Sequence, residues 1–153
     1  MLFYFYLLFY YLVIDITTSI IIGLIIAFLY GVGTFFAKIV SDKDPFLQWI
    51  IVNIVGIILC VYIVVKEPER LQLLHGKILV YGVISALMVV IGSLLLYYGL
   101  HKGKASVIVP LSSIGPAITA ILAIVFLKEQ LSYSQMFGIV LIVSGVILLS
   151  INS

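Results

Sequence analysis

Two long apolar runs lie next to each other in the chain, separated only by the segment His-Lys-Gly-Lys at residues 101–104. The runs cover residues 78–100 and 105–127, each is 23 residues long, and neither contains a charged residue. The hydrocarbon core of a bilayer is about 30 Å thick, and about 20 helical residues cross it. We therefore expect two adjacent transmembrane helices joined by a hairpin that is too short to hold more than a turn.

The composition of the whole chain agrees with a membrane protein. Of its 153 residues, 65% are hydrophobic and only 9% are charged, whereas soluble domains carry roughly 25% charged residues. The net charge of +2 and the absence of a basic run argue against a nucleic-acid partner. The single cysteine, Cys60, excludes an internal disulfide and any metal site built from several cysteines.

Five segments are long enough to cross a bilayer, and they predict an all-α membrane protein. Strands are excluded because these runs are twice the length of a barrel strand and lack its alternation, and because an open sheet leaves unpaired edges in lipid. Most of the connections are tight, so consecutive helices should be antiparallel neighbours. The predicted spans are residues 20–39, 46–65, 78–100, 105–127 and 132–151.

Residues 1–17 form a separate apolar N-terminal extension in this interpretation, followed by a five-helix domain over 18–151. Residues 2–14 hold four tyrosines and three phenylalanines, and as a helix they extend only about 20 Å, which is short of a crossing. Tyrosine favours the headgroup level, so we expect this segment at the interface or frayed. A longer, tilted first helix and a start codon assigned too far upstream are the alternatives.

Lysine and arginine counts in short loops normally set membrane orientation, but here the two sides carry the same number. One side holds Lys66, Arg70, Lys77 and Lys128, and the other holds Lys38, Lys43, Lys102 and Lys104. Either the protein has one orientation that such small counts do not reveal, or it has dual topology. In the second case, half of the copies insert each way and pair as an antiparallel homodimer.

Several features inside the spans allow both a packing role and a site role. Small residues recur at helical spacing in the first, third and fifth spans, which favours close helix–helix contact. Asn53 lies well inside the second span, where its amide needs a hydrogen-bond partner, either on another helix or on a solute. In the fourth span, Pro116 follows Gly115 near the centre and predicts a kink, while Pro110 lies nearer the helix start. A broken helix at this depth also exposes backbone groups that transporters use to bind solutes.

Acidic residues and histidines are absent from the interior of every predicted span. Buried carboxylates mark proton and cation relays, so facilitated exchange or uniport is as plausible here as proton coupling. No nucleophile–base pair, phosphate-binding loop or metal-ligand spacing is present either. We therefore expect neither enzymatic activity nor a cofactor or metal.

Several short segments share one pattern: an aromatic end to the third helix, a proline within the fourth, an acidic ending to the fourth and a glycine-rich fifth helix. These segments are 35–38, 97–100, 105–111, 115–116, 126–132 and 138–146. In this pattern the chain resembles the EamA domain of the drug/metabolite transporter superfamily, whose fourth helix ends in Leu-Gly-Glu. Two residues depart from the family pattern, Gly99 in place of an alanine and Lys128 in place of the glycine before Glu129, and the aromatic N-terminal extension is additional.

The resemblance implies a transporter made of two such five-helix halves in opposite orientations, of which this chain provides one. It implies that a second copy or a sister protein supplies the other half, and that small metabolites or drugs are exported or exchanged by alternating access in the plasma membrane. A membrane subunit that only stabilises or regulates a partner is the alternative. The resemblance implies a central cavity lined by the first, third and fourth helices. Together with Asn53, the candidate substrate-binding residues are Tyr30, Thr34, Ser93, Tyr97, Ser112, Pro116 and Thr119.

Overall fold

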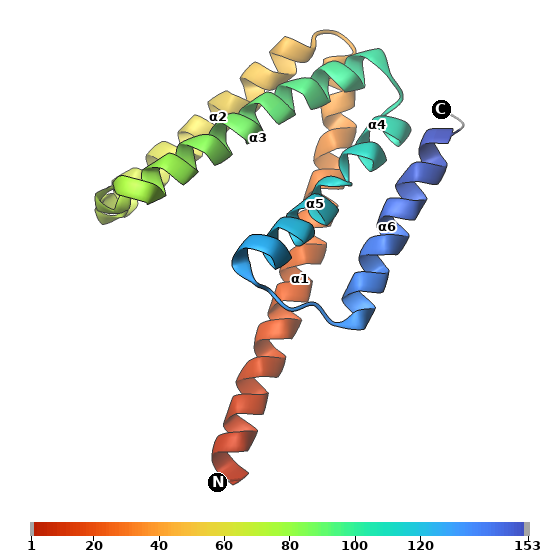
Figure 1. Cartoon of the computed structure of the whole chain (residues 1–153). Coiled ribbons are helices and arrows are strands. Elements are labelled where there is room, and N and C mark those ends of the chain that lie inside the picture. Colours follow the sequence, from red (N-terminus) through yellow and green to blue (C-terminus); the bar gives the residue numbers. More distant parts are fainter. Residues whose placement is uncertain (1, 152–153) are drawn as a thin grey trace. The chain divides into compact units, whose positions relative to one another are not determined.

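A computed structural model describes the backbone of residues 2–151 and the side chains of residues 17–151, and within these limits the chain is helical without strands (Figure 1). Five helical segments of this part are long and apolar enough to cross a membrane, as predicted. A 3₁₀ helix in the second connection was not predicted. The elements are α1 (Leu2–Ser41), α2 (Pro45–Lys66), the 3₁₀ helix η1 (Pro68–Leu73), α3 (Gly76–Lys102), α4 (Ala105–Ser112), α5 (Gly115–Leu122), the π-helical turn η2 (Ala123–Leu127) and α6 (Tyr133–Ile151).

The chain divides into two compact units, Met1–Phe36 and Ala37–Ser153. The first unit contains most of α1. The predicted interfacial role of residues 1–17 depends on side chains that, up to residue 16, lie outside the described residues, so it stays a prediction. All contacts discussed below, apart from those of Tyr30 and Thr34, lie within the second unit.

The start of α2 shows how the sequence sets a helix boundary. The Asp44 carboxylate accepts hydrogen bonds from the backbone N–H groups of Phe46 (2.7 Å) and Leu47 (3.2 Å). Pro45 follows as the first helical residue, where its missing N–H costs nothing. The predicted second span, residues 46–65, therefore begins within one residue of the observed helix, and the connection from α1 to α2 is a tight turn.

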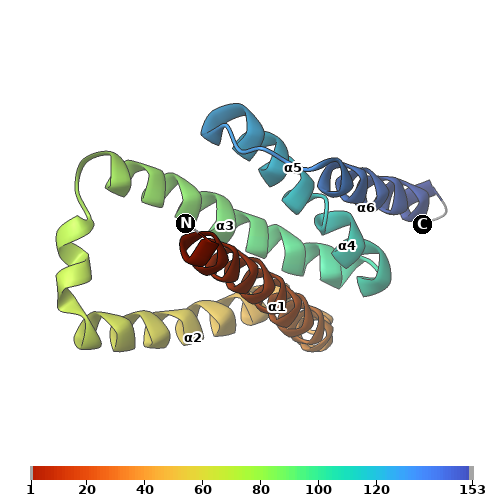
Figure 2. The ribbon, with the colours of Figure 1, turned by 90° about the horizontal axis from the view of Figure 1, so that it is seen from below.

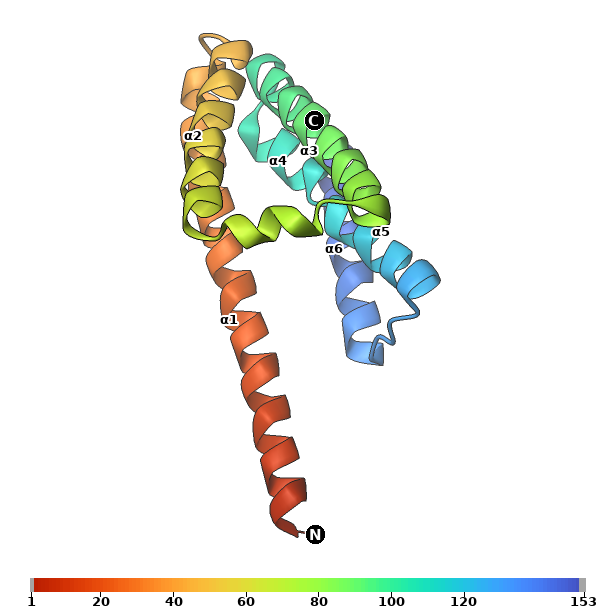
Figure 3. The ribbon, with the colours of Figure 1, turned by 90° about the vertical axis from the view of Figure 1, so that its left-hand side faces the viewer.

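Helices α2 and α3 approach each other near the α1–α2 turn and diverge toward η1, which joins their other ends (Figures 2 and 3). After the hairpin at Gly103, α4 packs against the end of α3, and α6 lies beside α4 and α5. A small core forms where these ends meet, from Ala37, Tyr97 and Leu100. Because most other side chains of this unit are exposed, its helices are packed at one end and open elsewhere.

Gly99 is one of the two departures from the family pattern, and the structure gives a reason for it. A Cβ atom at this position would lie 3.3 Å from Cγ2 of Ile108, which is closer than an ordinary van der Waals contact. A glycine therefore lets α3 and α4 approach closely at the hairpin without displacing Ile108, which packs against the core.

Lys128, the other departure, has a left-handed backbone conformation with φ 58° and ψ 29° at the end of η2. A side chain in this region costs about 1–2 kcal/mol, whereas glycine adopts it readily. We expect Lys128→Gly to raise the free energy of unfolding in detergent by about 1 kcal/mol. Gln130→Gly is the matched control, because Lys128 is the only non-glycine residue of positive φ in the described part of the chain. A gain that is equal in both variants would contradict the explanation.

Candidate functional site

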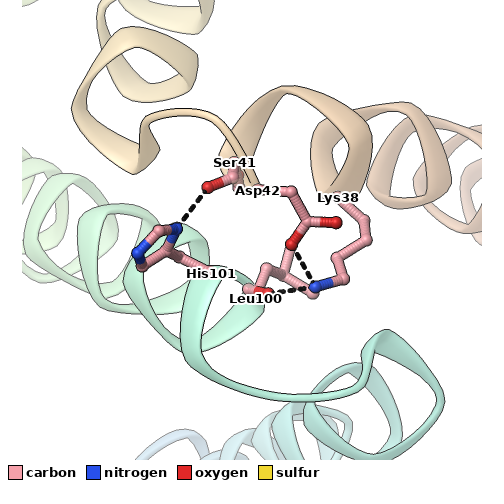
Figure 4. Close-up of polar contacts among 5 residues, drawn as sticks. All are labelled: Lys38, Ser41, Asp42, Leu100 and His101. Carbon is pink, nitrogen blue, oxygen red and sulfur yellow. Dashed lines mark hydrogen bonds and ion pairs between the residues drawn. The ribbon is translucent and has the colours of Figure 1, made fainter.

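The ends of α1 and α3 are joined by hydrogen bonds that run in both directions (Figure 4). From α1, Lys38 Nζ donates to the backbone oxygen of Leu100 (2.7 Å) and pairs with the Asp42 carboxylate. From α3, His101 Nδ1 donates to the backbone oxygen of Ser41 (2.8 Å). Each helix therefore supplies a side chain that satisfies a terminal carbonyl of the other.

This exchange resolves an electrostatic conflict. The last carbonyls of a helix lack intrahelical partners and carry partial negative charge, so two C-terminal ends placed together repel each other. A lysine and a histidine N–H between them offset that repulsion. The Lys38 side chain is 25% exposed, so its hydrogen bond to Leu100 is shielded from water. This pairing was not predicted from the sequence, because its partners are 62 and 60 residues apart.

A second polar group links α2 to α3 within the spans. Trp49 Nε1 donates to the backbone oxygen of Val90 (3.3 Å), which also accepts from Ser93 Oγ (2.8 Å). Asn53 Nδ2 donates to the backbone oxygen of Trp49 (2.7 Å). Asn53 and Ser93 thus belong to one hydrogen-bonded chain. Trp49 was not among the predicted site residues, although it is the only tryptophan of the sequence.

The prediction of an interhelical hydrogen bond for Asn53 is wrong. Its amide instead donates to a carbonyl one turn earlier in its own helix, which satisfies the group locally at little geometric cost. The interhelical bond of this region is made by Trp49, whose longer side chain reaches α3.

The fourth span is interrupted where Gly115 and Pro116 predicted a kink: α4 ends at Ser112 and α5 begins at Gly115. Around this break the hydroxyl groups donate to their own backbone. Ser112 Oγ donates to Val109 O (2.7 Å), Ser113 Oγ to Pro110 O, and Thr119 Oγ1 to Gly115 O (3.2 Å). Pro110 itself lies inside α4 rather than at its entrance.

The break also leaves backbone carbonyls without their usual donors. Pro116 has no N–H to donate to the oxygen of Ser112, four residues earlier. The N–H of Ala117 donates to Ile114 O (2.9 Å) instead of to Ser113 O. Two carbonyl oxygens and three hydroxyl oxygens therefore lie near the middle of the span; we call this set, made by Ser112, Ser113 and Thr119, the break site.

The other predicted site residues are distributed differently. Tyr97 is buried in the core with Ala37 and Leu100, one turn from Ser93. Tyr30 and Thr34 belong to the first unit, where Thr34 Oγ1 donates to Tyr30 O (2.8 Å) and Gly31 O (3.1 Å). Within residues 37–151, the predicted site residues other than Tyr97 thus fall into two polar groups, one on α2–α3 and one at the break. Among residues 17–151, no three His, Cys, Asp or Glu side chains gather to hold a metal ion.

Five apolar helices, one of them interrupted at mid-depth beside polar groups, indicate a multi-pass α-helical membrane protein. Residues 17–151 match the EamA-like transporter family, and the chain belongs to this family. The resemblance inferred from the sequence is therefore confirmed.

A curated relative is an uncharacterized protein of Methanocaldococcus jannaschii. It is 64% identical over 136 residues, which make up 89% of this chain and 98% of the relative. No solved structure matches the chain.

Proposed function

We propose that the protein exports or exchanges small metabolites or drugs across the plasma membrane, as a dimer of five-helix halves. The observation that carries this proposal is the match of nearly the whole chain to a transporter family in combination with a broken span. In alternating access, one half rocks against the other around a site near the midplane. The proposed solute contacts are Tyr30, Thr34, Asn53, Ser93, Tyr97, Ser112, Pro116 and Thr119.

The open surfaces of the second unit support a partner. Glycines in α3 and α6 mark faces on which another helix packs closely. Within the described structure, a Cβ atom placed on Gly82, Gly92, Gly138 or Gly145 meets nothing within 4 Å. The helix–helix packing that the sequence predicts at these faces is therefore not made within this unit, and a second half is what we propose to cover them.

The proposed second half is a second copy in inverted orientation, because four lysines or arginines lie on each side of the membrane. C-terminal fusions to a reporter active only inside the cell and to one active only outside should therefore both give signal, in comparable amounts. The control is Lys102→Gln combined with Lys104→Gln, which unbalances the count and should favour one reporter. A signal from one reporter alone in the unmodified protein would end the dual-topology proposal.

Counterflow of labelled solutes into liposomes that contain the purified protein tests transport itself. We expect exchange of at least one solute from a panel of amino acids, sugars and organic cations, and none in protein-free liposomes. Failure across the whole panel would favour the alternative, a membrane subunit that stabilises or regulates a partner without transporting.

A further inference from the structure

We propose that the break site selects solutes that donate hydrogen bonds, ammonium-bearing solutes first, and that it disfavours organic anions. This inference rests on the proposed transport function and names its substrate class. It follows from the kinds of hydrogen-bonding atoms that the interrupted fourth span presents.

The free backbone groups at the break are mainly acceptors. The oxygen of Ser112 lacks a donor because residue 116 is proline, and the oxygen of Ser113 is bypassed by the N–H of Ala117. Most backbone donors at the break already have an acceptor. The N–H of Ile114 donates to Leu111 O, and the N–H groups of Ala117 and Ile118 both donate to Ile114 O. Within residues 114–118, only the N–H of Gly115 is left to donate to a solute.

The side chains add further acceptors. The hydroxyl protons of Ser112, Ser113 and Thr119 are donated to backbone oxygens of the same span. Each hydroxyl oxygen keeps lone pairs, so it can accept a hydrogen bond without breaking the one it already donates. A solute that meets these groups therefore finds oxygen lone pairs rather than protons.

The electrostatics of the break point the same way. Residues 105–127 contain no charged side chain, so no cation is present in this span to attract an anionic group. The C-terminal end of α4 carries the partial negative charge of its last carbonyls. The N-terminal end of α5 carries partial positive charge at the same break. However, Pro116 has no N–H, and the N–H groups of Ala117 and Ile118 already donate to Ile114 O, so only the N–H of Gly115 remains there to meet an anion. Unwound carbonyls and helix C-terminal ends are groups that bind cations within membranes.

The free carbonyl oxygens of the break lie deep in the membrane, where an unpaired polar group costs the most free energy. Residue 116 is the midpoint of the span, so the oxygens of Ser112 and Ser113 lie within about 6 Å of mid-depth along the helix. An unsatisfied carbonyl in a region without water is costly. A solute ammonium or hydroxyl that donates to these oxygens removes that cost, whereas a carboxylate adds repulsion.

Counterflow with matched solutes tests the inference. Glucosamine, glucose and glucuronate share one ring and differ in charge, and putrescine and succinate share a four-carbon chain. We expect the ammonium member of each set to exchange at least tenfold faster than the carboxylate member, with glucose between. The same order should hold between amines and acids among the other solutes of the broader panel.

Two proline variants locate the effect. Pro116→Ala returns an N–H to the oxygen of Ser112 and should abolish exchange of the ammonium solutes. Pro110→Ala is the matched control, since it returns an N–H only to the carbonyl of Ser106, near the start of α4, and should leave exchange near the wild-type rate. Equal amounts of reconstituted protein confirm that both variants insert.

The outcomes separate the inference from the function on which it rests. Carboxylate solutes that exchange as fast as their ammonium partners would overturn the inference and leave the transporter in place. Unchanged ammonium exchange in Pro116→Ala, or equal losses in both proline variants, would also overturn it. No exchange of any solute would remove the transport function, and the inference with it.

Discussion

Thr119→Trp should lower the rate of counterflow by about tenfold or more, because the indole would displace a solute bound at this position. In enzymes, a displacement of about 1 Å lowers the rate by up to about 100-fold. Thr119 lies on α5 just after the break, and its hydroxyl donates to Gly115 O. If it faces the solute path, an indole at this position fills that path. The initial rate of labelled-solute uptake into preloaded liposomes measures the effect.

The matched control is Ile118→Trp, which adds the same indole on the adjacent face of α5. Ile118 is 54% exposed in the described structure and is not among the proposed solute contacts. Its variant should exchange solute within about twofold of wild type, as expected of a surface substitution. Similar uptake by wild type and Thr119→Trp would count against Thr119 as a contact, and a loss in both variants would indicate general damage to α5.

Lys38→Met should destabilise the protein by about 1.5–3 kcal/mol, the range for a hydrogen bond to a charged group. The substitution keeps an apolar stem but removes the Nζ atom that joins the end of α1 to Leu100 O and to Asp42. The carbonyl of Leu100, a residue that is 0% exposed, then loses that donor, and the two helix ends repel each other. Reversible unfolding in mixed micelles of increasing denaturing detergent measures the change.

Lys43→Met is the control for this prediction, because it removes the same charge from the adjacent turn. Within the described residues, Lys43 has no side-chain hydrogen bond or ion pair, so its variant should change stability by less than about 0.5 kcal/mol. Equal losses in the two variants would show that net charge, and not the contact between helix ends, sets the stability.

The spans were predictable because the driving force is local to each segment. A run of apolar residues long enough to cross lipid is helical whatever its neighbours are, since its backbone groups have only each other as partners. The same reasoning located the start of the second span to within one residue, and the missing N–H of Pro116 located the kink in the fourth span. The two residues that depart from the family pattern, by contrast, could be interpreted only from the structure. Gly99 is explained by how close a Cβ atom there would lie to Ile108, and Lys128 stands out by its positive φ.

The candidate site was predictable in part, and Asn53 shows why. Its type and depth indicated correctly that its amide needs a partner. Which hydrogen-bond acceptor the amide reaches depends on the geometry of a single helical turn. The amide donates to the carbonyl of Trp49 in its own helix and not to an atom of another helix. The role of Trp49 was missed because tryptophan is common at both ends of membrane spans, and its residue type does not indicate which carbonyl its indole N–H reaches.

The sequence alone determined that the chain contains five membrane helices, because hydrophobic length and backbone satisfaction are properties of each segment. The family was indicated separately, by the resemblance of several short segments to the EamA pattern. Only the tertiary structure decided which polar groups meet. It paired Lys38 with Leu100 and His101 with Ser41, and it directed the N–H of Ala117 to Ile114 O instead of Ser113 O. Those outcomes depend on distances between atoms that are far apart in the chain, or on which of two carbonyls one N–H reaches, and hydrophobic patterning specifies neither.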